Sequence, residues 1–396
     1  MKLNLLKNYI KQILSYILIF FIRYLNIKQK NNKISFISYP DLSDNAWYLF
    51  KYINQNRTNL ILIWLVDDIS NKKKIDLSNE FYKKNKIIIS KKWSLNGIYH
   101  YLSSRIVFST HGSYFFSKKN IGPVNVNLWH GMPIKKIGYL DQNQKYTPNY
   151  SDYYLSTSEL YSRILSKAFD VKKSKVLNFG LPRNDLLHPK SLLRKNIPKY
   201  KNKIWRKNKL IIWLPTYRFS YTGHVRKDSS TLNFLNEWPD NFLDNLNKIA
   251  KNFKIILIIK LHPLDLMNNK MNTKKLSNIK IYDNFNWEKN SLDLYELIFQ
   301  SDGLITDISS VIIDYIITKK PLGLTTKTLK FYNRGLIEEL KLFQNINFLK
   351  LNTIKDFENF FLKVKKNLKF NIDPKGIYYS KGHINSSMKI VKKFKI

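Results

Sequence analysis

The stretch that decides the fold runs from Gly303 to Pro321 and reads GLITDISSVIIDYIITKKP. Its apolar start, Gly303 to Thr306, predicts a short buried strand, and the residues beyond a polar turn predict a helix. Pro321 ends that helix, because proline cannot continue an α-helical hydrogen-bond ladder. We therefore expect a strand, a turn and a helix in immediate succession.

The polar residues of this stretch gather on one side of the predicted helix. At about 100° per residue, Asp307, Ser310 and Asp314 share a narrow stripe, and apolar side chains cover the rest. A helix that is apolar almost all round is normally buried, so its polar stripe needs a partner. Free N–H groups and the positive end of the helix dipole favour an anion there. We hypothesise that this turn, with Ser309, holds the phosphates of a nucleotide-activated donor; the alternative is a helix N-cap with one solvated Asp.

Length and composition indicate a folded protein of two domains. The chain has 396 residues, which is enough for two domains of ordinary size, each with its own core. A content of 44% hydrophobic and 14% aromatic residues argues against a disordered chain. The chain has no cysteine, which excludes disulfides, thiol catalysis and Cys-ligated zinc. Its 7 His residues lack the spacing of metal ligands, so we expect neither a metal nor another cofactor.

The formal net charge of +40 restricts the partners of the chain. Nucleic acid is one partner for such a charge, but no zinc-finger, RNP-type or basic-zipper pattern accompanies it, so we expect no nucleic acid. Lys and Asn are spread along the whole sequence and mixed with Ile, as in an AT-rich genome. A basic surface held against anionic lipid, or one that attracts a polyanionic substrate, fits this distribution better.

Residues 1–30 have the pattern of a membrane-interface helix. Basic residues flank the uncharged run from Ile13 to Ile22, which is too short for the roughly 20 residues that span a bilayer. No small-residue cleavage site follows, which argues against a secretory signal. We expect an amphipathic helix lying in the cytoplasmic membrane interface; the alternative is a first helix buried in the domain.

Strands that alternate with helical segments fill residues 31–190. The apolar run from Leu60 to Val66 predicts a buried strand, and the amphipathic segment from Asp44 to Ile53 predicts a helix. This alternation implies a parallel sheet with helices on both faces. The other strands predicted here cover 34–38, 86–89, 106–109, 126–129, 153–156 and 176–179.

A change in composition separates this domain from a second one. Residues 191–208 are rich in Lys, Arg and Asn with little periodicity, so we interpret them as an interdomain linker. A second α/β domain is predicted for residues 209–375, followed by a helical tail at 376–396. The predicted fold class is α/β, with two doubly wound, Rossmann-like domains that face each other across a cleft. The second series has predicted strands at 210–214, 254–260, 279–282, 303–306 and 321–324, and predicted helices at 240–251, 291–300, 307–318, 333–341 and 353–367.

Two histidines stand where predicted strands end. His130 is followed by Gly131, and Lys135 adds positive charge nearby. An imidazole at this place could take a proton from an acceptor hydroxyl, since its ordinary pKa is near working pH. His262 follows a strand of the second half in the same way, before a proline. Either residue alone could be a packed or capping residue, but one such His in each half favours function for both.

Two further strand ends carry groups that suit a phosphorylated ligand. Arg183 and Asn184 lie in a tight turn; the guanidinium could fork onto phosphate or pair with Asp185 in the turn. Thr216 and Arg218 end the first strand of the second domain, where a hydroxyl and a guanidinium favour a ligand over plain surface. No Walker A loop and no convincing GxGxxG fingerprint is present, so kinase and dehydrogenase chemistry lack their key element.

Five motifs together resemble the CDP-glycerol glycerophosphotransferase family, the polyol-phosphate transferases of teichoic acid and capsule synthesis. They follow one another in the family's order over nearly 190 residues, so the resemblance is specific although each motif alone is weak. Met132, Ile308 and Tyr217 depart from the residues commonest in the family, which bears on donor or acceptor identity but not on the reaction class. The motifs are WHGMPIKKIG (129–138), GLPRND (180–185), LPTYR (214–218), LHP (261–263) and ITDISSVIIDY (305–315).

The resemblance implies a GT-B-like fold and assigns roles to matching residues. His130 matches the family's proposed base, and His262 matches its second essential His near the phosphates. The donor-binding strand, turn and helix of the family correspond to Asp307, Ser309, Ser310 and Asp314.

The function implied is transfer of a polyol phosphate, most simply glycerol phosphate, from a CDP-activated donor. The acceptor is a hydroxyl of a lipid-linked saccharide or growing polymer at the cytoplasmic face of the bacterial membrane, where the enzyme is peripheral, and CMP is released. The alternatives are a GT-B glycosyltransferase that uses a nucleotide sugar, and a non-enzymatic basic membrane or nucleic-acid binder.

Overall fold

The computed structural model describes residues 27–75, 83–112, 114, 122–141, 151–188, 208–216, 238–261, 276–290, 292–326, 335–380 and 385–396. Most of the predicted membrane-interface helix (residues 1–26 of 1–30) and nearly all of the predicted linker lie outside these residues, as do His262 and Arg218. None of the described helices is long and apolar enough to cross a bilayer.

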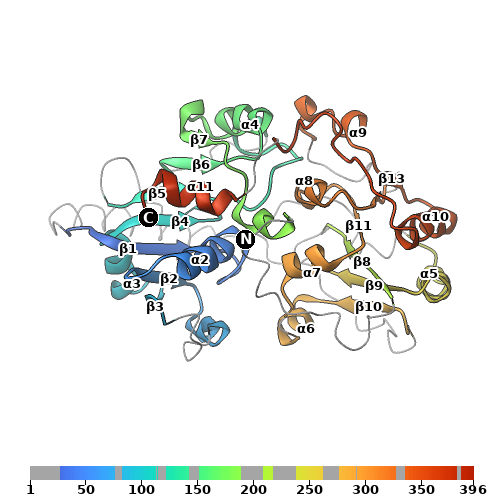
Figure 1. The fold of residues 1–396 in the computed structure, drawn as a ribbon, viewed down its shortest axis with the longest axis horizontal. Helices are drawn as coiled ribbons and strands as arrows, with labels where there is room; N and C mark the ends of the chain where they lie inside the picture. The colour runs from blue at the N-terminus through green and yellow to red at the C-terminus, as the bar shows by residue number, and fades with distance from the viewer. Residues whose placement is uncertain are drawn as a thin grey trace, which may run out of the picture. The chain divides into compact units, whose positions relative to one another are not determined.

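The chain divides into two compact units (Figure 1). The N-terminal unit holds the described residues up to Met132, then Gly138–Asp185 and Ser380–Ile396. The C-terminal unit holds Pro133–Ile137 and Leu186–Tyr379. The division differs from the predicted domain limits in three places: a five-residue segment after Met132 joins the C-terminal unit, that unit also begins at Leu186 rather than after residue 190, and most of the predicted tail joins the N-terminal unit.

The N-terminal unit is built on a seven-stranded parallel sheet in the order β3-β2-β1-β4-β5-β6-β7. β2 is apolar and buried along nearly its whole length, and β1 and β4 are buried over most of theirs, as expected where helices cover both faces of a parallel sheet. The strands are β1 (Lys30–Ile37), β2 (Ile61–Val66), β3 (Lys86–Lys91), β4 (Ser104–Ser109), β5 (Val124–Asn127), β6 (Tyr153–Leu155) and β7 (Val176–Leu177). The α-helices are α2 (Asp44–Asn56), α3 (Leu95–Leu102), α4 (Glu159–Phe169) and α11 (Ser386–Lys393).

The C-terminal unit repeats this design with six parallel strands in the order β10-β9-β8-β11-β12-β13. A core cluster of this unit packs Trp213 of the sheet against Phe242 and Phe357 from two helices. The strands are β8 (Lys209–Leu214), β9 (Ile255–Lys260), β10 (Ile279–Tyr282), β11 (Gly303–Thr306), β12 (Leu322–Leu324) and β13 (Leu349–Lys350). The α-helices are α5 (Phe242–Asn252), α6 (Asn284–Lys289), α7 (Leu294–Gln300), α8 (Val311–Tyr315), α9 (Leu342–Asn345) and α10 (Ile354–Lys365).

The two sheets confirm the predicted fold class. In each, the strand order reverses once, between β1 and β4 and between β8 and β11, which is the pattern of a doubly wound Rossmann-like domain. Ligands of such sheets bind outside the carboxyl ends of the strands at that reversal. Ligands are therefore expected near the residues that follow β1, β4 and β5 in one unit, and β8 and β11 in the other.

The helix predicted after β11 is shorter and tighter than expected. Only Val311–Tyr315 is α-helical, and Ile316–Thr318 continues as a 3₁₀ turn. The backbone N–H groups of Ile312 and Ile313 already donate to the carbonyls of Ser309 and Ser310, at 3.1 and 3.0 Å. β-Branched residues are poor helix formers, which suits a short helix in this isoleucine-rich run. A helix dipole is therefore not the feature that could attract an anion here.

The end of the chain is anchored on the N-terminal unit. The buried Asp185 carboxylate accepts hydrogen bonds from the backbone N–H groups of Ser386 and Ser387, at 2.6 and 2.9 Å, and so caps α11. Arg57 Nε and Arg105 Nη1 donate to the backbone carbonyls of Ile396 and Phe394, at 2.8 and 3.1 Å. Asp185 therefore has a structural role, because its carboxylate binds the first N–H groups of α11.

The protonation of Asp185 is expected to change stability with pH. Burial raises the pKa of this carboxyl group to about 6, and the hydrogen bonds from Ser387 and Ser386, which favour the charged form, offset this only in part. Because the folded protein then binds the proton more tightly than the unfolded chain, the stabilisation is full below about pH 4 and is lost as the pH rises towards 6. The free energy of unfolding should fall by up to about 3 kcal/mol across this range.

Urea unfolding of wild type and Asp185→Asn between pH 4 and 7 measures this effect. The asparagine variant should lack this component of the slope, whereas Asp170→Asn, which changes an exposed carboxylate, should keep it. Equal slopes for wild type and Asp185→Asn would show that Asp185 does not titrate in this range.

Candidate active site

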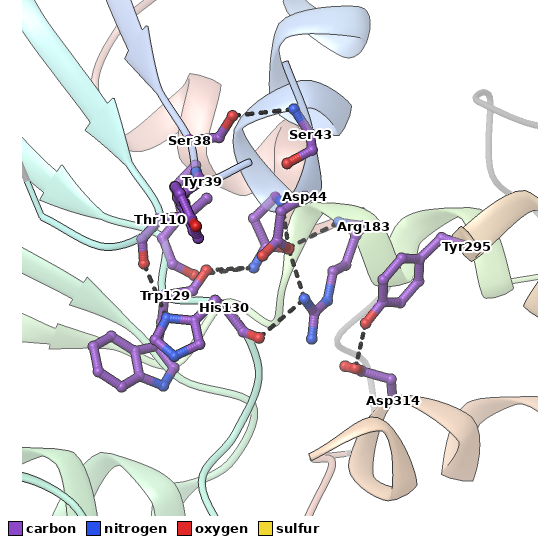
Figure 2. A network of polar contacts seen from close by, with 12 residues as sticks. Ser38, Tyr39, Ser43, Asp44, Thr110, Trp129, His130, Arg183, Tyr295 and Asp314 are labelled. Carbon is purple, nitrogen blue, oxygen red and sulfur yellow. Dashed lines mark hydrogen bonds and ion pairs between the residues drawn. The ribbon is translucent and has the colours of Figure 1, made fainter. Parts of the chain in front are cut away.

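The carboxyl ends of β4 and β5 carry the candidate base of the N-terminal unit. His130 follows β5 by three residues, and its ring Nδ1 lies 3.3 Å from the backbone carbonyl of Thr110, the residue after β4 (Figure 2). Trp129 and Gly131 on either side of it have φ angles of +58° and +125°. Glycine is needed at the second position, because a side chain rarely tolerates that backbone. The chain therefore turns sharply at the strand end and leaves the His130 ring half-buried.

A buried polar scaffold supports this turn. Asn45 Nδ2 donates to the backbone carbonyls of Leu128 and Trp129, at 3.3 and 2.7 Å, and Asn45 Oδ1 accepts from the N–H of Arg183 at 3.2 Å. Asn45 has no exposed surface, so these bonds are shielded from water. Arg183 and Asn184, predicted to bind substrate, are also buried in this scaffold.

The guanidinium of Arg183 lies between two partners of the same unit. Its Nη1 donates to Asp44 Oδ1 at 2.6 Å and to the backbone carbonyl of His130 at 3.1 Å (Figure 2). The side chains of this ion pair are only 5% and 14% exposed. The sequence left two interpretations of Arg183, a phosphate contact or a pair with Asp185 in the turn. The Asp185 carboxylate binds the N–H groups at the start of α11, and the carboxylate that pairs with Arg183 is that of Asp44.

Lys135 belongs to the C-terminal unit, although it follows His130 by only five residues. It is buried and forms an antiparallel bridge with Leu336. Neighbouring backbone bonds extend this pairing, from Ile337 N to the Ile134 carbonyl and from Lys136 N to the Gly335 carbonyl, both at 2.9 Å. The short segment after the His-Gly motif is thus a built-in part of the second unit.

The reversal point of the C-terminal sheet joins Thr216 to Asp307. The Asp307 carboxylate accepts from the Thr216 N–H, with both oxygens at 3.1 Å, and from the Thr216 hydroxyl at 3.0 Å. Thr216 follows β8 and Asp307 follows β11, so the two strands are tied together at their carboxyl ends. Both residues lie at strand ends, where ligands of such a sheet bind, and their role in donor binding stays a prediction.

The other predicted residues of the β11 turn face different surroundings. Asp314 is completely buried and accepts a hydrogen bond from the Tyr295 hydroxyl at 2.7 Å. Ser309 and Ser310 are only partly buried, so their hydroxyl groups can reach a ligand. Within the described residues, no group of three or more His, Asp or Glu side chains is arranged to hold a metal ion.

Comparison with known proteins identifies the family. Residues 18–343 match the family described as CDP-Glycerol:Poly(glycerophosphate) glycerophosphotransferase. The chain belongs to this family. The description names CDP-glycerol as the donor and poly(glycerophosphate) as the acceptor, so the protein is a transferase of the glycerophosphotransferase kind.

Individual relatives of this glycerophosphotransferase agree with that assignment. A teichoic acid poly(glycerol phosphate) polymerase of Bacillus spizizenii is 26% identical over 337 residues, which cover 79% of each protein. A teichoic acid glycerol-phosphate transferase of Staphylococcus aureus is 25% identical over 348 residues, covering 80% of this chain and 79% of the relative. The structure of a variant of the wall teichoic acid polymerase TagF, soaked with CDPG, superposes with a TM-score of 0.67 at 20% identity. That superposition covers 100% of this chain and 98% of the other, and it supports the GT-B-like fold.

Three residues of the candidate site were not predicted as site residues. Asp44 and Asn45 begin a helix, and their spacing from His130 carries no signal of contact. His111 lies in a second strand-end His-Gly pair, which repeats the pattern of His130 and Gly131. That repeated pair was the one signal in the sequence that could have revealed it.

Proposed function

We propose that this glycerophosphotransferase moves a polyol phosphate, most simply glycerol phosphate, from a CDP-activated donor to an acceptor hydroxyl in teichoic acid-type synthesis. The proposal rests on one observation: the His130 ring is half-buried near the end of a strand, in a chain of this family. The Nδ1 of His130 bonds to the Thr110 carbonyl, so we assign the proton transfer to Nε2.

The proposed reaction is a single displacement at phosphorus. His130 Nε2 takes the proton of the acceptor hydroxyl, and the oxygen attacks the β-phosphorus, the one that carries the polyol. A new P–O bond to the acceptor forms as the bond to the bridging oxygen breaks. CMP leaves with that oxygen, and the proton remains on His130 until solvent removes it.

The donor phosphates are proposed to lie at the reversal point of the C-terminal sheet. Ser309 and Ser310 offer hydroxyl groups there, next to Thr216, whose N–H and hydroxyl both donate to Asp307. Arg218 and His262, which lie outside the described residues, are proposed to offset charge on the transferring phosphoryl group. Preorganised donors of this kind typically contribute about 3 to 4 kcal/mol each to transition-state stabilisation.

A donor panel tests this function. Purified protein is incubated with an acceptor glycan and CDP-glycerol, CDP-ribitol or UDP-sugars, and the acceptor is weighed by mass spectrometry. Mass increments of a polyol phosphate with a CDP-polyol support the proposal. Increments of a sugar with UDP-sugars, and none with either CDP-polyol, would reject it in favour of a glycosyltransferase.

We also propose that the acceptor is lipid-linked and that the enzyme acts at the cytoplasmic face of the membrane. The basic, apolar sequence of residues 1–30 and the net charge of +40 support attraction to an anionic surface. Deletion of residues 1–25 should abolish co-sedimentation with phosphatidylglycerol vesicles and leave turnover on a soluble acceptor unchanged. Replacing Ile13 to Ile22 by serine, with every Lys and Arg retained, separates the apolar from the electrostatic contribution. Full co-sedimentation of the deletion variant would contradict this mode of binding.

A further inference from the structure

His111, which follows β4, lies directly against His130, the proposed base. Its ring is parallel to that of His130, with 4.0 Å between the ring centroids and an interplanar angle of 5°. The Trp129 ring also contacts the His130 ring, with 4.3 Å between the ring centroids and an interplanar angle of 33°. Two rings cannot both lie about 4 Å above one face of an imidazole, so His111 and Trp129 cover opposite faces. The His130 ring is therefore held between two others.

One residue, Thr110, connects both histidines. Its backbone carbonyl lies 3.3 Å from His130 Nδ1, and its hydroxyl lies 2.9 Å from His111 Nδ1. Thr110 is completely buried and fixed to β1, because its N–H donates to the Ile37 carbonyl and its hydroxyl accepts from the Tyr39 N–H, at 3.1 and 3.3 Å. A shift of either ring would have to break bonds to this anchored residue.

The bond to a carbonyl also decides the tautomer of His130. A carbonyl oxygen only accepts hydrogen bonds, so Nδ1 must carry the hydrogen, and the lone pair of the neutral ring then lies on Nε2. We propose that His111 is a positioning residue of the transfer reaction: with Thr110 and Trp129 it holds His130 in the Nδ1–H tautomer, with Nε2 facing the acceptor hydroxyl. This inference rests on the proposed function of His130 and adds a residue that acts through it.

The charges around His111 agree with this role. Although the residue is exposed, desolvation around its ring, followed by the charges of His130, Arg183 and Lys92, lowers the pKa of His111 well below its ordinary value. Of these charged groups, Arg183 is paired with Asp44. His111 is thus neutral at pH 7 and can stay stacked when His130 takes a proton, whereas two imidazolium ions would repel.

A pair of substitutions separates the ring of His111 from its polar atoms. His111→Phe keeps a flat ring against His130 and loses the bond to Thr110, and His111→Asn keeps a polar group for Thr110 and loses the ring. With CDP-glycerol as donor, we expect kcat of His111→Phe within about threefold of wild type and kcat of His111→Asn about 10- to 100-fold lower, with KM changed less than about threefold in both. A kcat for His111→Phe as low as that of His111→Asn would overturn the positioning role, because it would mean that the imidazole itself is required.

Nitrogen NMR of ¹⁵N-labelled histidine reads the tautomer without any turnover. The His130 signals, assigned by their loss in His130→Gln, should show a protonated Nδ1 and an unprotonated Nε2 in wild type and His111→Phe, and a mixture of tautomers in His111→Asn. A single unchanged tautomer in His111→Asn, together with wild-type kcat, would reject the inference. If His130→Gln is inactive in that case, the proposed function still stands; if His130→Gln is fully active, the base assignment fails, whatever the His111 variants do.

Discussion

Replacing His130 by glutamine is expected to lower kcat by about 10²- to 10⁴-fold, the usual contribution of a general base. Glutamine is similar in size and polarity but cannot take a proton at neutral pH, so the acceptor hydroxyl must attack without help. CMP release from CDP-glycerol measures kcat, and thermal unfolding checks that the variant is folded. KM for the donor should change little, because donor binding is assigned to the C-terminal unit.

A histidine of the same unit outside the site serves as the matched control. His100 lies in α3, and His100→Gln should keep kcat within about twofold of wild type. If His130→Gln retains most of the wild-type kcat, His130 is not the base, and the proton must leave the acceptor by another route.

Truncating Arg183 is expected to give the largest loss of stability among the site residues, about 3 to 5 kcal/mol. Arg183→Ala leaves the Asp44 carboxylate uncompensated in a site where it is only 14% exposed, and it removes the donor that holds the His130 carbonyl. Urea unfolding measures the loss, and kcat should fall as well because the turn that carries His130 loses its support. Adding Asp44→Asn to Arg183→Ala should recover part of the stability, since no buried charge then lacks a partner.

An exposed ion pair of the same unit provides the comparison. Lys173 pairs with Glu159, with side chains 53% and 59% exposed, so Lys173→Ala should reduce the free energy of unfolding by less than about 1 kcal/mol. Equal losses for Arg183→Ala and Lys173→Ala would mean that the Arg183–Asp44 pair is solvated and does not support the site.

Long apolar runs made most of the fold predictable. The strand expected at 60–66 is β2 (Ile61–Val66), and the one expected at 254–260 is β9 (Ile255–Lys260), because central strands of a covered parallel sheet are apolar along their whole length. β13, with two residues, and α6, with six, are too short to give a periodic signal and were missed. The helix after β11 was overestimated because its apolar pattern continues through the 3₁₀ turn at Ile316–Thr318.

The sequence indicated candidate site residues where reactive side chains follow a strand end. It did not indicate contacts between residues that are far apart in the sequence. His130, Thr216 and Asp307 stand within three residues of a strand end, and parallel topology brings such residues to one edge of a sheet. Arg183 is 139 residues from Asp44, and nothing in either segment favours this pair over the nearby Asp185. Tertiary packing determines that Arg183 pairs with Asp44, and no local sequence pattern indicates such a pair.

The configuration at phosphorus tests the central claim most directly. The donor is CDP-glycerol with a β-phosphorus made chiral by sulfur and isotopic oxygen, and the product is analysed after one transfer. Direct attack by the acceptor hydroxyl, with His130 acting only as the base, predicts inversion. Retention would contradict the account, because it would require two displacements and a covalent phospho-enzyme, with a histidine acting as the nucleophile.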